Sequence, residues 1–266
     1  DIAVIETGLG GRLDSTNIID PELSIITNIG LDHTNLLGNS IEEIAMEKAG
    51  IIKKETAILI GKEQVATKSI FKEVSDAKNA PLYFADKIAV LNTDLKGGYQ
   101  EKNICTTVSA IKQLQSLGWN ISDRNIKKGL EKVVKNTGIL GRWQTLSESP
   151  RIICDVGHNE DGIKEIVKQL NKLKYQKLHF VYGTVNDKDF DRILSLLPKD
   201  AKYYFCKPNI QRGLSAENLQ RKAKKHQLLG NAFNSVDDAI CRAKENQKRE
   251  DVLFIGGSTF VVAEAL

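Results

Sequence analysis

Residues 151–170 read RIICDVGHNEDGIKEIVKQL, and this stretch carries the pattern that decides the fold. Its first five residues form a short apolar run that ends at Asp155, which is typical of a buried strand. After it, apolar residues recur at the i, i+3, i+4, i+7 spacing of one buried helix face: Ile163, Ile166, Val167 and Leu170. A strand followed by a helix that covers it is the repeating unit of a parallel α/β sheet.

The same alternation runs along the rest of the chain. Apolar runs predict strands at residues 2–6, 24–29, 56–60, 88–91, 151–155, 178–182, 203–206 and 252–255. Helix-period segments predict further helices at residues 215–228 and 237–247. Glycines interrupt the pattern near residues 137–149, and a Ser-Glu-Ser-Pro stretch follows at residues 147–150, so we expect a linker near residues 137–149. The sequence therefore predicts two α/β domains, residues 1–140 and 146–266.

Composition narrows the class of protein. Of 266 residues, 41% are hydrophobic and 27% are charged, and the net charge is +4. No apolar run approaches the roughly 18 residues of a membrane span, and the basic run at residues 221–225 lies on a predicted amphipathic helix without aromatic residues. The four cysteines form no C-x-x-C pair, as expected for reduced thiols. We predict a monomeric cytoplasmic protein that binds neither nucleic acid nor membrane. The opening apolar run, which has no initiator Met, suggests a fragment.

Polar side chains follow two of the predicted strands. Glu6 ends the first strand and precedes a glycine-rich turn, and His33 follows the second strand. Since the carboxyl ends of parallel strands meet at one edge of a sheet, both side chains are expected at that edge. A carboxylate and an imidazole can together hold a divalent metal. An ordinary turn and a structural histidine are the alternative interpretations.

A lysine occupies an unusual position on the next predicted helix. Ser40 and Glu43 form a capping box that predicts where the helix begins. The apolar face that follows comprises Ile41, Ile44, Ala45 and Lys48. Because burial of an ammonium group is costly, Lys48 is expected to have a lowered pKa or to reach solvent along its flexible stem. An uncharged lysine reacts with carbon dioxide, and the carbamate that forms is an anionic metal ligand.

Three motifs together resemble a known family. Residues 6–17 (ETGLGGRLDSTN), 27–33 (TNIGLDH) and 47–53 (EKAGIIK) resemble segments of folylpolyglutamate synthases/dihydrofolate synthases, which belong to the Mur ligase superfamily. The resemblance implies part of a P-loop-type ATPase central domain followed by a Rossmann-like C-terminal domain. It also implies an ATP- and Mg²⁺-dependent ligase that adds L-glutamate to dihydropteroate or folate through an acyl phosphate.

The resemblance also implies roles for individual residues. Glu6, His33 and carbamylated Lys48 match magnesium ligands, and Lys48 and His158 match groups at the reacting centre. The positions that match pteroate contacts are Arg12, Leu13 and Asp14. The positions that match ATP contacts are Asn103, Arg142 and Asp155.

Some positions depart from the family pattern. Gly157 and Glu160 replace the alanine and the proline of the D-x-A-H-N-P motif. No G-x-x-G-K-S/T phosphate-binding loop occurs in the 266 residues, so this chain is predicted to be inactive by itself. A non-catalytic remnant and another Mur-type amide ligase are the alternatives. A nucleotide-linked oxidoreductase is disfavoured because the glycines at positions 8, 10 and 11 do not fit G-x-G-x-x-G.

Overall fold

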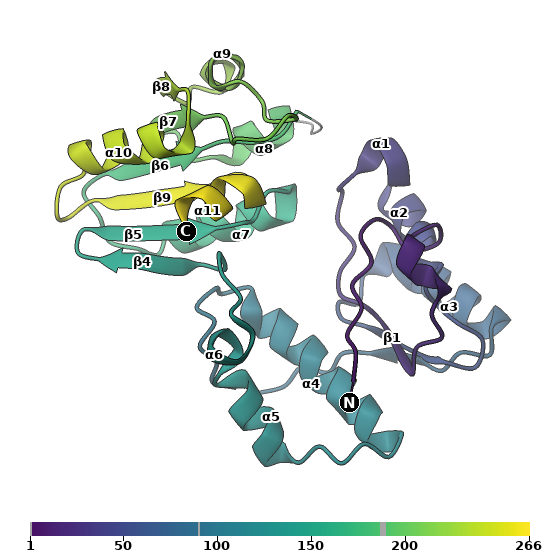
Figure 1. Ribbon diagram of the computed structural model, residues 1–266. Helices are drawn as coiled ribbons and strands as arrows, with labels where there is room; N and C mark the ends of the chain where they lie inside the picture. The colour runs from purple at the N-terminus through teal and green to yellow at the C-terminus, as the bar shows by residue number, and fades with distance from the viewer. Residues whose placement is uncertain (1, 90, 187–189) are drawn as a thin grey trace. The chain divides into compact units, whose positions relative to one another are not determined.

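The computed structural model of the chain describes residues 2–89, 91–186 and 190–266 (Figure 1). These residues form two units. The first comprises Asp1–Asp94 and Tyr99–Lys132, and the second comprises Leu95–Gly98 and Val133–Leu266. The chain passes from the first unit to the second between residues 132 and 133, which is earlier than the linker predicted near residues 137–149.

A three-stranded parallel sheet lies at the centre of the first unit, in the order β1 (Leu23–Ile26), β2 (Ala57–Ile60) and β3 (Leu82–Phe84). Leu23 pairs with Ala57, and Ile58 pairs with Leu82. The helical segments of this unit are η1 (Ser15–Ile18), α1 (Thr34–Leu37), α2 (Ile41–Ala49), α3 (Val65–Ala77), α4 (Gln100–Ser116) and α5 (Asp123–Leu130).

Apolar faces of α2 and α3 cover this small sheet. Ile44 of α2, Phe71 of α3 and Ile58 of β2 are fully buried in one cluster. Helix α2 begins where the sequence predicts, because the Ser40 hydroxyl accepts a hydrogen bond of 3.1 Å from the Glu43 amide. The predicted strands at residues 24–29 and 56–60 correspond to β1 and β2.

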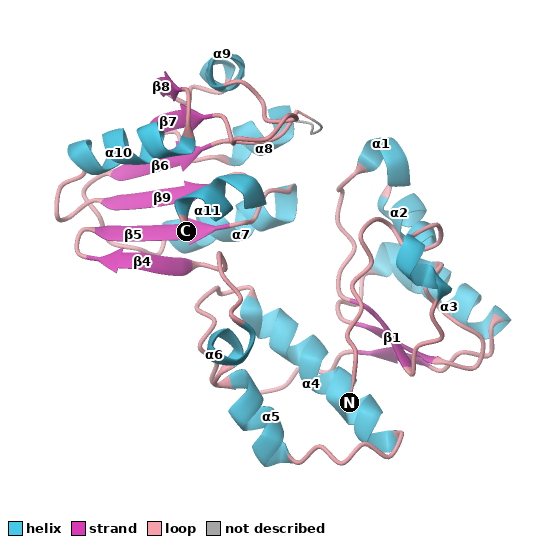
Figure 2. Ribbon diagram, in the orientation of Figure 1, coloured by secondary structure: helices cyan, strands magenta, loops and turns pink. Residues whose placement is uncertain are grey.

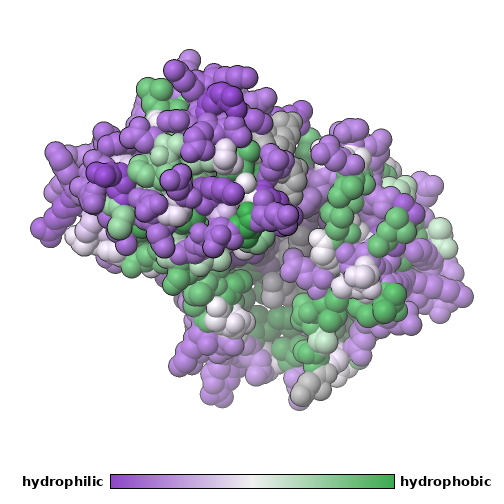
Figure 3. Space-filling view, turned by 45° about the horizontal axis from the view of Figure 1, so that its top comes forward, coloured by the Kyte–Doolittle hydropathy of each residue, from purple (hydrophilic) through white to green (hydrophobic). Residues whose placement is uncertain are grey.

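Two strand predictions for the first unit are wrong. Residues 2–6 are not a strand, and Ile2 and Val4 are 54% and 90% exposed. Hydrophobic residues are accordingly visible on the surface of this unit (Figure 3). A strand needs the hydrogen bonds of a neighbouring strand, and none of the described strands pairs with this segment.

The second incorrect strand covers residues 88–91. Val90 lies outside the described residues, and the other three residues are not in a strand. Ile88 and Leu91 pack instead against the cluster that Ile104, Val108 and neighbouring residues of α4 and α5 form. The third strand of the sheet is the shorter β3, which precedes this segment.

A six-stranded sheet organises the second unit (Figure 2). The strand order is β4 (Gln144–Glu148), β5 (Arg151–Asp155), β9 (Val252–Gly256), β6 (Leu178–Tyr182), β7 (Lys202–Cys206) and β8 (Gly230–Phe233). Among the described strands of this sheet, β4 and β5 alone form an antiparallel pair. The four strands predicted for this unit agree with the structure to within one residue. The linker prediction is wrong at its C-terminal part, because residues 144–148 pair with β5 as an edge strand.

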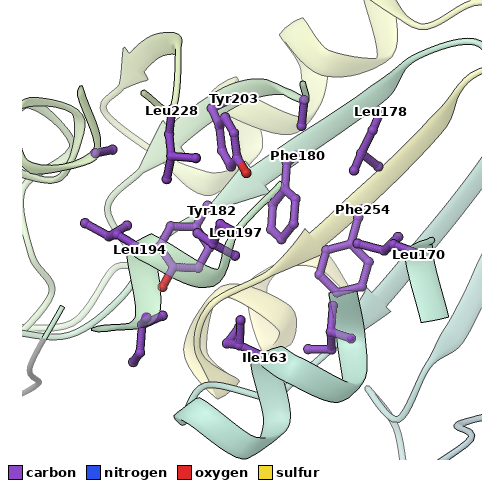
Figure 4. Packing of buried hydrophobic residues seen from close by; sticks show 14 of the residues in the cluster. Ile163, Leu170, Leu178, Phe180, Tyr182, Leu194, Leu197, Tyr203, Leu228 and Phe254 are labelled. Carbon is purple, nitrogen blue, oxygen red and sulfur yellow. The ribbon is translucent and has the colours of Figure 1, made fainter. Parts of the chain in front are cut away.

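Helices cover both faces of this sheet. On one face lie α7 (Glu160–Leu170), α8 (Phe190–Leu196) and α9 (Ala216–Lys225), and on the other lie α10 (Val236–Asn246) and α11 (Thr259–Ala265). The short α6 (Val133–Thr137) precedes β4. Between the sheet and helices α7, α8 and α9 lies one hydrophobic core. In this core the centroids of the Phe180 and Phe254 rings are 4.9 Å apart, and Leu170 of α7 packs in the same cluster (Figure 4).

A parallel sheet covered on both faces places the loops that follow its strands along one edge. In the second unit, the loop after β5 begins at Asp155 and leads into α7. Within residues 2–89, 91–186 and 190–266, no helix combines the length and hydrophobicity that are needed to cross a membrane.

Candidate functional site

The glycine-rich loop after Glu6 lies against the last turn of α2. The Arg12 amide donates a 2.8 Å hydrogen bond to the Glu47 carbonyl, and its guanidinium donates to the Glu47 carboxylate at 3.0 and 3.1 Å. A Cβ atom on Gly11 would lie 2.9 Å from the Glu47 carbonyl oxygen and 3.0 Å from that of Lys48. A residue without a side chain is therefore required where this loop meets α2.

Asp14 shapes the same loop from within. Its carboxylate accepts hydrogen bonds from the amides of Leu9, at 2.8 Å, and Thr16, at 2.9 Å. The hydrogen bond from the Thr16 hydroxyl is the largest cause that lowers the pKa of Asp14 to about 2, and these amides add to it. Leu13 beside it is 79% exposed. Of the three predicted pteroate contacts, Arg12 and Asp14 thus hold the loop together while Leu13 projects from it.

Lys48 is half-buried in the last turn of α2. Burial lowers the pKa of its ammonium group, and the negative charge of Asp32 opposes this shift. Sequence reasoning did not single out Asp32, although it directly precedes His33 in the T-N-I-G-L-D-H motif. The structure therefore brings the second and third motifs together at Lys48.

His33 has a left-handed backbone conformation, with φ 51° and ψ 38°, immediately before α1. Its amide donates a 2.9 Å hydrogen bond to Asp32 Oδ1, and its ring Nε2 lies 4.0 Å from the same oxygen. The His33 side chain is 46% exposed. Asp32 and His33 thus form one polar corner at the end of the loop that follows β1.

Glu6 lies in extended coil with its side chain exposed. In the described part of the chain, the Glu6 carboxylate makes no hydrogen bond or ion pair, and the structure does not join it to His33 or Lys48. No group of three or more His, Cys, Asp or Glu side chains suited to a metal ion occurs among the residues described. Asn103 lies in the first turn of α4, where its side-chain Nδ2 donates a 2.9 Å hydrogen bond to Gln100 Oε1.

Two of the predicted ATP contacts, Arg142 and Asp155, lie on segments of the second unit that hydrogen bonds join. Buried Asp155 accepts hydrogen bonds from the amides of Trp143, at 2.8 Å, and Gly157, at 2.7 Å. The Val156 amide donates a 2.9 Å hydrogen bond to the Gly141 carbonyl. Asp155 therefore fastens the turn that carries Arg142, whose side chain is exposed, to the loop after β5.

His158 follows in the same loop. Its Nδ1 lies 3.0 Å from the carbonyl oxygen of Val156, and since a carbonyl only accepts, Nδ1 carries the hydrogen. In the neutral ring, Nε2 then has the lone pair that can accept a proton. Asn159 ends the loop, because its side chain accepts a 2.9 Å hydrogen bond from the Gly162 amide and caps α7.

The two departures from the family motif also have local explanations. A Cβ atom on Gly157 would lie 2.8 Å from Ile166 Cδ1, so the alanine found in the family pattern would crowd this packing. Glu160, which replaces proline, lies in the first turn of α7 and pairs with Lys164 at 2.5 Å and with Arg192 of α8 at 3.9 Å. Glu160 thus links the start of α7 to α8.

The chain is similar to known proteins in both sequence and fold. Residues 141–259 match the family described as Mur ligase, glutamate ligase domain. The dihydrofolate synthase/folylpolyglutamate synthase of Escherichia coli is 31% identical over 284 residues, which cover 100% of this chain and 64% of that protein. The structure of E. coli FolC in complex with DHPP and ADP matches with a TM-score of 0.83 and 30% identity, over 97% of this chain and 64% of that one.

A second solved structure is a bifunctional folylpolyglutamate synthase/dihydrofolate synthase with Mn, AMPPNP and L-glutamate bound. It matches with a TM-score of 0.80 and 28% identity, over 97% of this chain and 64% of that one. The chain thus spans about 64% of the length of these relatives. The predicted family resemblance and α/β fold class are confirmed: the chain is similar over nearly its whole length to folylpolyglutamate synthases/dihydrofolate synthases, and its second unit matches the glutamate ligase domain of Mur ligases.

Proposed function

We propose that this chain supplies a large part of the active site of an ATP-dependent ligase that joins L-glutamate to dihydropteroate or folate. The observation that carries the proposal is the position of Lys48, half-buried in the last turn of α2, where the charge of Asp32 acts on it, and one residue after the Glu47–Arg12 anchor. The relatives, which include a FolC bound to DHPP and ADP and a synthase bound to L-glutamate, support the choice of substrates.

The reaction joins two carboxylate-bearing substrates in two steps. The pteroate or folate carboxylate first takes the γ-phosphoryl group of ATP, which gives an acyl phosphate and ADP. The glutamate amine then attacks the acyl carbon, and phosphate leaves as the amide forms. Because the carboxylate and the triphosphate repel each other, positive charge is needed where they meet. We assign part of this charge to exposed Arg142, which directly precedes the Trp143 amide that Asp155 binds.

Within this proposal, the glutamate amine must lose a proton before or while it attacks. We assign that proton to His158 Nε2, because the contact between Nδ1 and the Val156 carbonyl leaves Nε2 as the basic nitrogen of the neutral ring. Arg12, Leu13 and Asp14 are proposed to contact the pteroate, with Leu13 offering the exposed apolar side chain. Asn103 and Asp155 are proposed on the nucleotide side.

Glu6, His33 and carbamylated Lys48 are the proposed magnesium ligands. Their donors fit: carboxylate and carbamate oxygens suit a hard divalent cation, and one imidazole is compatible with it. The lowered pKa of Lys48 favours the uncharged amine that reacts with carbon dioxide. The carbamate would add an anionic oxygen donor to a set that otherwise has only the Glu6 carboxylate and the His33 imidazole. When bound, the cation would offset the charge of the phosphates.

The decisive experiment compares two lengths of protein. Because the 266 residues contain no G-x-x-G-K-S/T loop, we expect this chain alone to release no phosphate from ATP in the presence of dihydropteroate and glutamate. A longer version that includes such a loop should release phosphate only when all three substrates are present. Glutamate-dependent phosphate release by the 266-residue chain, or none by the longer protein, would contradict the proposal.

We further propose that the protein is a cytoplasmic monomer that binds neither nucleic acid nor membrane. All four cysteines, at positions 105, 154, 206 and 241, are free thiols, which suits a reducing compartment. Sedimentation of the purified protein tests the monomer, and an oligomer at micromolar concentration would overturn it.

A further inference from the structure

The side chain of Gln64 forms two hydrogen bonds with the backbone of Ile29. Its Nε2 donates to the Ile29 carbonyl at 3.0 Å, and its Oε1 accepts from the Ile29 amide at 3.1 Å. Ile29 is 2% exposed. A carboxamide that both donates to and accepts from one residue reproduces the pairing of a neighbouring strand.

This contact extends the sheet beyond its last regular pair. Strands β1 and β2 pair up to Ile26 and Ile60, and the Gly61 amide still donates to the Ile26 carbonyl at 2.8 Å. Beyond this point the two segments no longer pair through their backbones, and the side chain of Gln64, which lies just before α3, reaches back to Ile29. The Gln64 side chain therefore fixes the backbone of the loop after β1 where backbone pairing has ended.

The loop that follows carries Asp32 and His33. Its far end is held by α1, because the His33 carbonyl accepts hydrogen bonds of 2.9 Å from the amides of Leu36 and Leu37. The near end is held at Ile29 by Gln64. Only residues 30–32 lie between these two anchors, so loss of one anchor would release the corner that Asp32 and His33 form.

We propose that Gln64 is a positioning residue, which holds Asp32 and His33 where Lys48 and the divalent cation of the proposed function require them. The proposal rests on that proposed function, and it assigns Gln64 no contact with substrate. Gln64 occupies the N-cap position of α3, but its side chain makes no capping hydrogen bond there. The backbone carbonyl of Gln64 accepts from Thr67 and Lys68, and substitution of the side chain leaves that group in place.

Two variants of Gln64 remove one or both hydrogen bonds of its carboxamide, and a control variant reports general effects on folding. Gln64→Met keeps the length of the side chain and removes both hydrogen bonds, whereas Gln64→Glu keeps the acceptor and loses the donor. Gln115→Met is the matched control, because Gln115 is also half-buried in the first unit and also donates to a backbone carbonyl, that of Ile121. Amide hydrogen exchange by mass spectrometry on the 266-residue chain is the first measurement.

We expect exchange in residues 27–37 to be about tenfold faster in Gln64→Met, less so in Gln64→Glu, and unchanged in Gln115→Met. In a longer, ligating version of the protein, the Mg²⁺ concentration for half-maximal activity should rise about tenfold in Gln64→Met alone. A lowered melting temperature without these two effects would reduce Gln64 to a structural residue.

Three outcomes would overturn the proposal. These are unchanged exchange in residues 27–37, faster exchange spread evenly over the first unit, and an unchanged Mg²⁺ requirement in an active Gln64→Met enzyme. The exchange experiment does not depend on ligation. If the unsubstituted longer protein fails to ligate, the proposed function fails, and exchange still decides whether Gln64 holds the loop.

Discussion

Arg12 and Glu47 are joined through both backbone and side chains, although 35 positions separate them in the sequence. The backbone hydrogen bond is 2.8 Å long, and the guanidinium–carboxylate contacts are 3.0 and 3.1 Å. The Arg12 side chain is 56% exposed and that of Glu47 is 25% exposed. The ion pair therefore adds modestly to a contact that the backbone already makes.

Substitution of Arg12 tests that division of roles. We expect Arg12→Met to raise amide exchange in residues 8–14 up to about fivefold, because an exposed ion pair contributes only about 0.2–1 kcal/mol. The melting temperature should change little, since the backbone bond to Glu47 remains. Arg124→Met on α5 is the control and should leave residues 8–14 unaffected. A large loss of melting temperature would show that the ion pair holds the fold of the first unit.

Lys48 should make the folded protein less stable at neutral pH than a neutral residue would. Because burial lowers the pKa of Lys48, the folded state binds fewer protons than the unfolded state between the lowered pKa and 10.5. The resulting destabilisation is present below the folded pKa and disappears as the pH rises to 10.5. Lys48→Met should therefore melt at a higher temperature than the unsubstituted chain at pH 7, and the gap should narrow towards pH 10.

The same variant separates stability from chemistry. Lys48→Met in a longer, ligating protein should have no ligase activity, and added bicarbonate should not restore it, because no amine remains to form a carbamate. Lys54→Met is the control, since the Lys54 side chain is 77% exposed, and it should retain both activity and melting temperature. Retained ligation in Lys48→Met would remove Lys48 from the proposed site.

A buried histidine in the second unit predicts sensitivity to acid. His179 Nδ1 lies 2.9 Å from the Tyr204 hydroxyl, and Nε2 lies 3.3 Å from Asp251 Oδ2. Burial lowers the pKa of His179 despite the opposing effect of Asp251. The unfolded state therefore binds more protons, so the stability contributed by neutral His179 is present above pH 6.5 and declines as the pH falls through 6.5.

This acid effect can be measured through Trp143, which is 8% exposed and packs on Phe254 in the same unit. In a Trp119→Phe background, the melting temperature followed by Trp143 fluorescence should fall between pH 7.5 and 5.5. His179→Gln should flatten this dependence, whatever stability it costs at pH 7.5. An equally steep decline in His179→Gln would locate the acid sensitivity elsewhere in the unit.

Gly157 packs closely against Ile166, and we predict an energetic coupling between these two positions that a double-mutant cycle can measure. Its added Cβ atom would lie 2.8 Å from Ile166 Cδ1, which belongs to a fully buried side chain. We expect Gly157→Ala to cost about 1 kcal/mol of unfolding free energy through overpacking. Ile166→Val removes that Cδ1 atom and should itself cost about 1 kcal/mol.

The double variant should then be no less stable than Ile166→Val alone, which corresponds to a coupling of about 1 kcal/mol in urea unfolding. The pair Gly162 and Ile163 offers a reference, since a Cβ atom on Gly162 would approach Asn159 Oδ1 and not an isoleucine methyl group. Gly162→Ala with Ile163→Val should therefore give additive costs. Additivity in the Gly157 cycle would mean that Ile166 does not limit the residue at position 157.

The amino-acid sequence by itself determined the elements whose burial follows from local periodicity. Residues 151–170 read as strand and helix because their apolar positions already define the buried faces of β5 and α7. The edge strands β4 and β8 were not predicted, since they bury none of their residues fully and so lack a continuous apolar run. The three family motifs likewise determined which residues to inspect for chemistry.

Tertiary structure alone decided which segments pair and which groups meet. Residues 2–6 have the composition of a strand, but a strand forms only where another chain segment supplies hydrogen bonds. The effect of Asp32 on Lys48 and the two hydrogen bonds from Gln64 to Ile29 join residues 16 and 35 positions apart. Such contacts depend on how separate elements pack, and no periodicity within one segment encodes them.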